Sequence, residues 1–183
     1  FYPDTDDTAV ALIVLSQFRH DQKRKARGID EAVRLGVDWL TGMQSRGGGW
    51  GAFDKDNDKK ILTKIPFCDF GEALDPPSVD VTAHIVEAFG KLGYRRDHPV
   101  MARAIGWLKN EQEEDGSWFG RWGVNYIYGT GAVLPALEAI GEDMAEPYVQ
   151  RACDWLLSKQ QADGGWGESC ASYMDPAMSG RGK

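Results

Sequence analysis

The sequence predicts an all-α protein with the architecture of an α/α toroid, a ring of paired inner and outer helices. A motif with two tryptophans and a glutamine occurs three times at fixed spacing, and an apolar helical segment precedes each copy. Many of the 22 glycines and 7 tryptophans fall in these motifs. Self-similar units of this length are typical of repeat architectures. Because such a ring closes at roughly six helix pairs, three pairs supply about half of one barrel.

Each repeat ends in a motif that we call a staple, at residues 39–50, 107–118 and 155–166. In every copy the first Trp lies 11 residues before the second, and a Gln lies 5 residues after the first. Apolar residues at three- and four-residue spacing predict a helix up to the Gln, and the glycines that follow end it. We expect the second Trp to cover the helix end. We expect the Gln amide to bond backbone groups of the next repeat, because it both donates and accepts hydrogen bonds.

A more apolar helix is predicted before each staple helix, and the three copies align on a threonine near their start. These threonines are Thr8, Thr82 and Thr130. The second and third lie 25 residues before the first Trp of their staple, whereas the first lies 31 residues before it. We assign the extra length to a basic loop at residues 23–27. A longer loop, residues 51–78, separates the first two pairs, and loops of this length in compact domains are usually functional.

The threonine alignment brings Asp6, Asp80 and Tyr128 to the same position of the repeat. Each stands at the N-terminal end of an inner helix, so we expect the three side chains to converge on one side of a central cavity. Residues 4–7 (DTDD) supply three carboxylates, more than one helix cap needs. Crowding favours a proton on one carboxyl, whereas helix N-termini favour the ionised form. A carboxylic acid retained at neutral pH suits general-acid chemistry.

His84 lies four residues after Asp80 and therefore on the same helix face. It is expected either to donate a hydrogen bond to an ionised Asp and sharpen the acidity of its partner, or to be an ordinary core histidine. Aromatic residues are frequent near these positions, where core packing explains them but where their rings could also stabilise cations. They are Phe53, Phe67, Phe70, Trp118, Phe119, Trp122, Tyr126 and Tyr128.

Composition and motifs argue against several other classes. The net charge of -7 and the lack of a long basic stripe argue against nucleic-acid binding. Three cysteines without a CxxC motif argue against a disulfide framework or a zinc site. The longest apolar run, residues 9–15, is too short to span a membrane. Residues 54–65 begin like a calcium loop, but Lys59 and Ile65 stand where Gly and Glu are required. We therefore expect no metal and no cofactor.

Residues 3–10 (PDTDDTAV) resemble the DxDDTA motif of class II triterpene cyclases, and the three staples resemble their QW motifs. Residues 116–131, together with residues 66–72 and 75–78, are similar to segments of the bacterial squalene–hopene cyclases. The resemblance covers essentially the whole chain. It implies that residues 1–183 are a partial α/α-barrel catalytic domain, with the remaining helices and a second barrel domain absent.

The resemblance also implies roles for the acidic cluster. Asp6 would protonate the terminal alkene of a polyene, and Asp4 and Asp7 would flank and tune it. His84 would assist through a hydrogen bond. Asp80 would help to shape the acid site.

The same resemblance implies further roles. Tyr128 would lie near the acid and a reprotonating water. Trp122 and Phe53 would stabilise early cations, and Phe53 offers no hydroxyl where some relatives carry Tyr. Phe67 and Cys68 would lie at the constriction of the substrate channel.

The activity implied by the resemblance is the cyclisation of squalene to hopene and hopanol without a metal or cofactor, as in hopanoid biosynthesis. Such enzymes are monotopic on the cytoplasmic side of the cell membrane, and a homodimer is compatible with the resemblance. We expect this chain alone to be inactive and poorly folded, because half a ring leaves inner helices uncovered. Product outcome is expected to depend on the absent parts.

Two other functions remain open from the sequence alone. The DxDD pattern also fits a class II cyclase that acts on a tetraprenyl or diterpenoid substrate, although the staples and residues 116–131 favour a triterpene. A non-catalytic α/α toroid that binds a partner would share the repeats. The crowded acids beside His84 argue against such a scaffold, which has little use for them.

Overall fold

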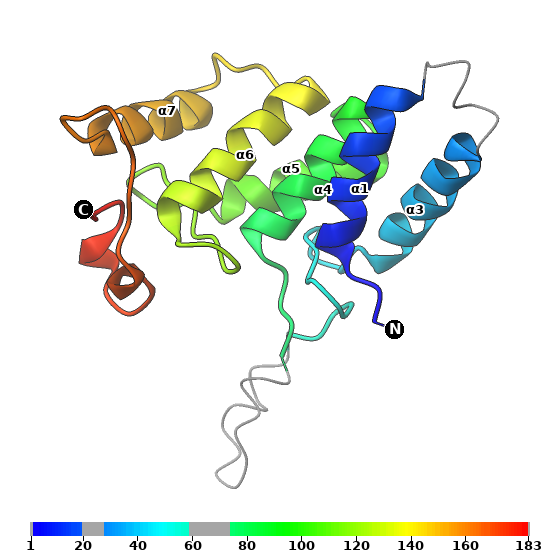
Figure 1. Ribbon diagram of the computed structural model, residues 1–183, viewed down its shortest axis with the longest axis horizontal. Helices are drawn as coiled ribbons and strands as arrows, with labels where there is room; N and C mark the ends of the chain where they lie inside the picture. Colours follow the sequence, from blue (N-terminus) through cyan, green and yellow to red (C-terminus); the bar gives the residue numbers. More distant parts are fainter. Residues whose placement is uncertain (1, 20–27, 59–73, 183) are drawn as a thin grey trace, which may run out of the picture.

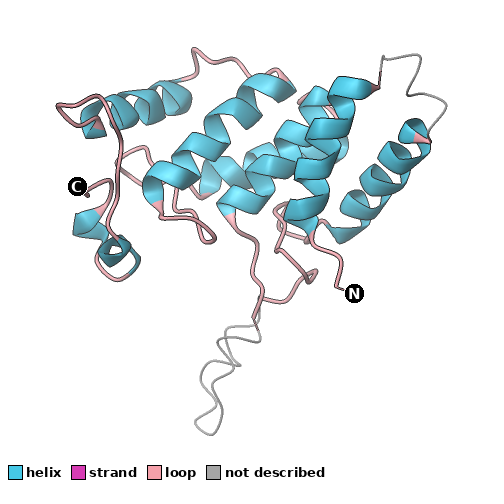
Figure 2. Cartoon of the chain, viewed as in Figure 1, coloured by secondary structure: helices cyan, strands magenta, loops and turns pink. Residues whose placement is uncertain are grey.

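The computed structural model describes residues 2–19, 28–58 and 74–182. These residues form α-helices and two short 3₁₀-helices, and no strand is found among them (Figure 2). The α-helices are α1 (Thr5–Phe18), α3 (Ile29–Met43), α4 (Val79–Lys91), α5 (Pro99–Asn110), α6 (Tyr126–Ile140) and α7 (Pro147–Lys159). The 3₁₀-helices are η3 (Cys170–Tyr173) and η4 (Pro176–Met178). The predicted all-α class is therefore confirmed.

The helices pair in chain order, α1 with α3, α4 with α5 and α6 with α7. The first members of the pairs lie side by side, with α4 between α1 and α6 (Figure 1). The second members lie outside this row, so α1, α4 and α6 are the inner helices of the arrangement. This is the α/α toroid architecture, with the pairing predicted from the repeats.

The core is densest around α4, the central inner helix. Ile85, Val86 and Phe89 are fully buried there. Each such side chain stabilises the fold by about 1.5–3 kcal/mol relative to an exposed one. Gly90 brings α4 against α6, because a Cβ at that position would lie 2.5 Å from the carbonyl carbon of Ala139. This contact holds the C-terminal ends of α4 and α6 close together.

The second Trp of each staple covers the end of its helix, as predicted. Trp50 and Trp118 are fully buried, and each indole N–H donates to the carbonyl ten residues earlier at 2.7 Å. Trp166 makes the equivalent bond at 2.9 Å but is 46% exposed. These bonds satisfy carbonyls that a helix end would otherwise leave unpaired.

The glutamines of the first two staples connect one repeat to the next, as was predicted. Gln44 Nε2 donates to a carbonyl in its own turn and, at 2.9 Å, to Val100 O in the first turn of α5. Gln112 does the same, reaching Tyr148 O in α7 at 2.8 Å. Arg151 on α7 donates to Gln112 Oε1 at 2.9 Å. The outer helices are therefore joined through side-chain amides.

The threonines that aligned the inner helices have a shared contact in the second and third repeats. Thr82 Oγ1 accepts from the backbone N–H of Trp50 at 3.0 Å. Thr130 Oγ1 accepts from the backbone N–H of Trp118 at 2.9 Å. Thr8 differs, because its hydroxyl donates to Asp4 O within its own helix start. The staples thereby hold α4 and α6 at their N-terminal ends.

Some predictions concern residues outside the described ranges. The basic loop at residues 23–27 and the channel residues Phe67 and Cys68 fall there. Within the described ranges, no helix combines the length and apolarity needed to cross a membrane.

Candidate active site

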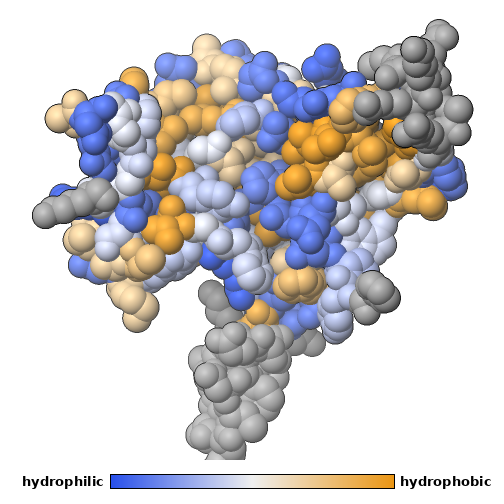
Figure 3. All heavy atoms as spheres, in the orientation of Figure 1, coloured by the Kyte–Doolittle hydropathy of each residue, from blue (hydrophilic) through white to orange (hydrophobic). Residues whose placement is uncertain are grey.

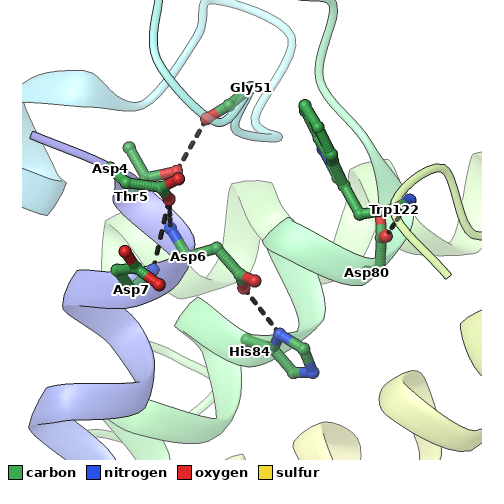
Figure 4. A network of polar contacts seen from close by, with 8 residues as sticks. All are labelled: Asp4, Thr5, Asp6, Asp7, Gly51, Asp80, His84 and Trp122. Atoms are coloured by element: carbon green, nitrogen blue, oxygen red, sulfur yellow. Dashed lines mark hydrogen bonds and ion pairs between the residues drawn. The ribbon is translucent and has the colours of Figure 1, made fainter. Parts of the chain in front are cut away.

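Asp4 is the N-cap of α1. Its Oδ1 accepts from the backbone N–H groups of Asp6 at 2.7 Å and Asp7 at 3.2 Å (Figure 4). A capping carboxylate satisfies N–H groups that the helix leaves free. The start of α1 is fixed further by Thr5, whose buried hydroxyl donates to Gly51 O at 2.7 Å. Asp6 is therefore presented from a doubly anchored helix start.

Asp6 and His84 point toward each other from α1 and α4 (Figure 4). Asp6 Oδ1 and His84 Nδ1 are 2.6 Å apart, and the two side chains are 30% and 21% exposed. A charge-assisted hydrogen bond has this short length. Helix spacing put His84 on the same face as Asp80, and the hydrogen bond that the family resemblance implied for His84 is made to Asp6, the acid of the preceding repeat.

The pKa of His84 is raised above its usual value, chiefly by the hydrogen bond to Asp6. The negative charges of Asp6, Asp80 and Glu87 act in the same direction, against the effect of burial. The protonated imidazolium is therefore favoured, and its Nδ1–H donates to Asp6 Oδ1. The arrangement leaves the second carboxyl oxygen of Asp6 free of this bond.

Asp80 supports a neighbouring loop. It is 1% exposed, and its Oδ2 accepts from the backbone N–H of Trp122 at 2.7 Å (Figure 4). Its charge also contributes to the raised pKa of His84 and of Tyr128. Asp80 thus links the acid pair to the loop that carries Trp122, in line with the expected shaping role.

Tyr128 packs edge-to-face against His84, with ring centroids 6.3 Å apart. Its ring lies against Gly123, where an added Cβ would be 2.4 Å from Tyr128 Cδ1. Burial, together with the charges of Asp80 and Asp6, raises the pKa of Tyr128, so the phenol keeps its proton. The predicted convergence of Asp6, Asp80 and Tyr128 therefore occurs around the His84 ring.

Phe53 and Trp122 form an aromatic wall, which is joined to this cluster through the hydrogen bond from Trp122 N to Asp80. Their rings meet edge-to-face at 6.1 Å and are 37% and 52% exposed. They line a pocket of 460 Å³ with Tyr2. Asp75, to which the sequence gave no role, holds the Phe53 loop by accepting from the backbone N–H of Phe53 at 2.6 Å. An Asp beside two prolines was the only sequence signal for this contact.

Asp7 differs from the other acids of the cluster. It is exposed, and the described residues provide no hydrogen bond to its carboxylate. The clustered acids therefore divide into a cap, an acid paired with His84 and an exposed residue. Across the described ranges, no group of three or more His, Cys, Asp or Glu side chains could hold a metal ion.

Comparison with known proteins identifies the family. The family model for the squalene–hopene cyclase C-terminal domain matches residues 1–183. The chain belongs to this family. The squalene–hopene cyclase of Alicyclobacillus acidocaldarius is 60% identical over 182 residues, which cover 100% of this chain and 28% of that protein. The squalene–hopene cyclase of Schizosaccharomyces japonicus is 58% identical over 177 residues, covering 97% of this chain and 26% of that protein.

More distant family relatives carry other names. The dammaradiene synthase of Dryopteris crassirhizoma is 38% identical over 200 residues, which cover 100% of this chain and 29% of that protein. The crystal structure of a protein from Actinoplanes matches 87% of this chain and 43% of its own, with a TM-score of 0.60 and 19% identity. The structural match supports the fold alone. The sequence matches place the chain among the cyclases, while it spans little more than a quarter of these curated relatives.

Proposed function

We propose that this chain is the acid-bearing segment of a longer squalene–hopene cyclase, which converts squalene to hopene and hopanol through carbocations. The observation that carries the proposal is the 2.6 Å contact between Asp6 Oδ1 and His84 Nδ1, on the rim of the inner helices. The family relationship supports a cyclase, and the names of the Alicyclobacillus and Schizosaccharomyces relatives support squalene as the substrate.

Asp6 is the proton donor in this proposal. Its Oδ1 accepts from protonated His84, and its other oxygen carries the proton that is transferred. The C–H bond forms at one alkene carbon, the π electrons of the alkene supply the pair, and a tertiary cation remains at the other carbon. The nearby imidazolium strengthens the acid because it stabilises the carboxylate that is left behind.

Successive alkenes of the polyene then attack the cation, and each attack forms a C–C bond and leaves a new cation. Trp122 and Phe53 face the pocket and stabilise early cations through their ring faces. The sequence of ring closures ends when the last cation loses a proton to a water molecule, giving hopene, or when water adds and the resulting oxonium ion loses a proton to solvent, giving hopanol. Tyr128, neutral and beside the acid, holds a water that relays a proton from solvent to Asp6.

The rest of the barrel, the second barrel domain and the membrane contact belong to the longer protein in this proposal. An apolar patch lies over α1 (Figure 3). Val10 and Val14 on this helix are 46% and 48% exposed, as expected for an inner helix that neighbouring helices would cover. We therefore expect the isolated chain to be poorly folded and inactive. A cooperative thermal melt of the isolated chain would argue that its folding does not depend on the remaining helices.

The decisive experiment compares the complete enzyme with its Asp6→Asn variant, by mass spectrometry of the products formed from squalene. The wild type is expected to give pentacyclic products, and Asp6→Asn to lose them by about 10³-fold or more while remaining folded. Asp97→Asn, an exposed aspartate on the connection before α5, is the matched control and should behave as wild type. Polycyclic product from Asp6→Asn at the wild-type rate would sink the assignment.

Two further arms separate the alternatives. A tetraprenyl substrate turned over faster than squalene would favour another class II cyclase. A chelator is expected to leave the rate unchanged, and metal dependence would contradict the proposed acid mechanism.

A further inference from the structure

The loop at residues 119–125 carries Trp122 and is held from two sides. On the inner side Asp80 Oδ2 accepts from Trp122 N at 2.7 Å. On the outer side it meets the segment that comes after α7, which contains η3. The proposed function assigns no role to that segment.

Glu168 in this segment makes three backbone contacts. Its Oε2 accepts from Asn125 N at 3.1 Å and Ile127 N at 2.8 Å, where α6 begins. Its Oε1 accepts from Gly180 N at 3.0 Å. A carboxylate at a helix N-terminus satisfies free N–H groups and is favoured by the helix dipole. Asn125 makes no side-chain cap for α6, so Glu168 replaces the local cap from 41 residues away.

Tyr173 holds the middle of the same loop. Its hydroxyl lies 2.7 Å from Gly123 O and 3.1 Å from Arg121 O, the two residues that flank Trp122. Ser172 adds a contact, because its hydroxyl accepts from Asn125 Nδ2 at 3.2 Å. The loop between the second and third repeats is therefore tied to η3 along its length.

The contacts of the η3 segment with this loop act on the candidate active site through two side chains. Trp122 is the cation-facing ring, and its backbone lies between Asp80 on one side and the Tyr173 hydroxyl on the other. Tyr128 rests on Gly123, whose carbonyl accepts from Tyr173. A shift of this loop would move both rings relative to Asp6.

We propose that Glu168 and Tyr173 are positioning residues, which set the Trp122 loop and the start of α6 against the acid site. This proposal rests on the proposed cyclase function. Glu168 and Tyr173 touch no reacting atom in it. They act by keeping Trp122 where the first cations form.

The test uses the complete enzyme with squalene, in Glu168→Ala and in Tyr173→Phe, which removes a single hydroxyl. A displaced aromatic face no longer stabilises early cations, so they lose a proton before the later rings close. We expect the share of products with one or two rings to rise about tenfold in Glu168→Ala and about threefold in Tyr173→Phe, with kcat lowered and KM within about twofold. Hydrogen–deuterium exchange at residues 119–128 should rise in both.

Glu168→Gln keeps one oxygen that can accept from Asn125 N and Ile127 N, so it should restore most of the wild-type profile. Glu138→Gln, on the exposed side of α6, is the matched control and should change nothing. If Glu168→Ala fails to fold, Tyr173→Phe decides alone. An unchanged product profile in the folded variants overturns the positioning role and leaves the cyclase function standing. A wild type that forms no cyclic product overturns the proposed function itself.

Discussion

The staples and the N-terminal ends of the inner helices recur at the same positions of each repeat. They differ in whether the contacts at those positions are also the same. Trp50 and Trp118 make the same 2.7 Å bond in the same buried setting. Asp6, Asp80 and Tyr128 also occupy one repeat position, yet one pairs with His84, one holds a loop N–H and one packs an aromatic ring. The repeated contacts therefore belong to the scaffold, while the equivalent positions at the N-terminal ends of the inner helices carry different residues with different contacts.

The staples themselves differ at the end of the described chain. Gln44 and Gln112 each reach a carbonyl of the following outer helix, while Gln160 bonds only its own turn, at Gly164 O. A staple is thus complete only where the next repeat packs on it. The free energy of unfolding should therefore depend mainly on the staples, and turnover should depend on the residues at the N-terminal ends of the inner helices.

The largest expected effect comes from removing a buried staple ring. Trp50→Ala should lower the free energy of unfolding of the complete enzyme by about 3–5 kcal/mol, because it leaves a cavity and an unpaired carbonyl. Trp166→Ala, whose ring is 46% exposed in residues 1–183, should cost a similar amount in the complete enzyme if a following repeat packs on the third staple. Denaturant unfolding measures both, and a loss below about 2 kcal/mol in Trp166→Ala would contradict the covering of this staple by a further repeat.

His84→Phe should lower turnover by about 100-fold with little loss of stability, because it removes the donor to Asp6. In the wild type the raised pKa of His84 keeps its imidazole ring protonated at pH values somewhat above 6.5, the usual pKa of histidine. Turnover should fall as the pH rises through that raised pKa, and His84→Phe should lose this alkaline limb.

The control for this pH dependence is His98→Phe, at the N-cap of α5 and away from Asp6. Its pH–rate profile should match that of the wild type. An alkaline limb that persists in His84→Phe would assign the titration to another group.

A smaller effect is expected at the staple glutamines. Gln112→Leu should cost about 2 kcal/mol, because it leaves the carbonyls of Gly116 and Tyr148 without their amide donor. Gln160→Leu should cost about 0.5 kcal/mol if no further repeat bonds to its amide, because among the described residues it then loses a single bond, to the exposed Gly164 carbonyl. The shift in the denaturant concentration at the unfolding midpoint, with an unchanged denaturant dependence of the free energy, measures each loss of stability. Turnover per folded enzyme should be unchanged in both variants.

Within the acidic cluster, the smallest effect is expected at Asp4. Asp4→Ala should cost about 1 kcal/mol through loss of the N-cap. Asp4→Ser keeps a capping oxygen without the charge, so thermal melting should return close to the wild-type value. If Asp4→Ser regains wild-type stability but turns over more slowly than the wild type, the charge of Asp4 tunes Asp6 in addition to capping the helix.

The sequence by itself determined the repeat and most of the scaffold that is built from it. Fixed spacing of Trp and Gln defines a helix end, and the same chemistry recurs in each copy, so the helix pairs, the buried tryptophans and the amide links could be predicted. The threonine alignment also brought Asp6, Asp80 and Tyr128 to one end of the inner helices. Local pattern was sufficient here because each contact lies within one repeat or joins neighbouring repeats in a constant geometry.

Only the tertiary structure decided which partner each polar group takes. Helix spacing alone put His84 on the face of Asp80 and named no acid as its partner, and the packing of α1 on α4 puts it 2.6 Å from Asp6, 78 residues away. The contacts of Asp75 with the Phe53 loop and of Glu168 with the start of α6 also join non-equivalent positions. No period in the sequence encodes such contacts, because they depend on how loops of unequal length fold back over the inner helices.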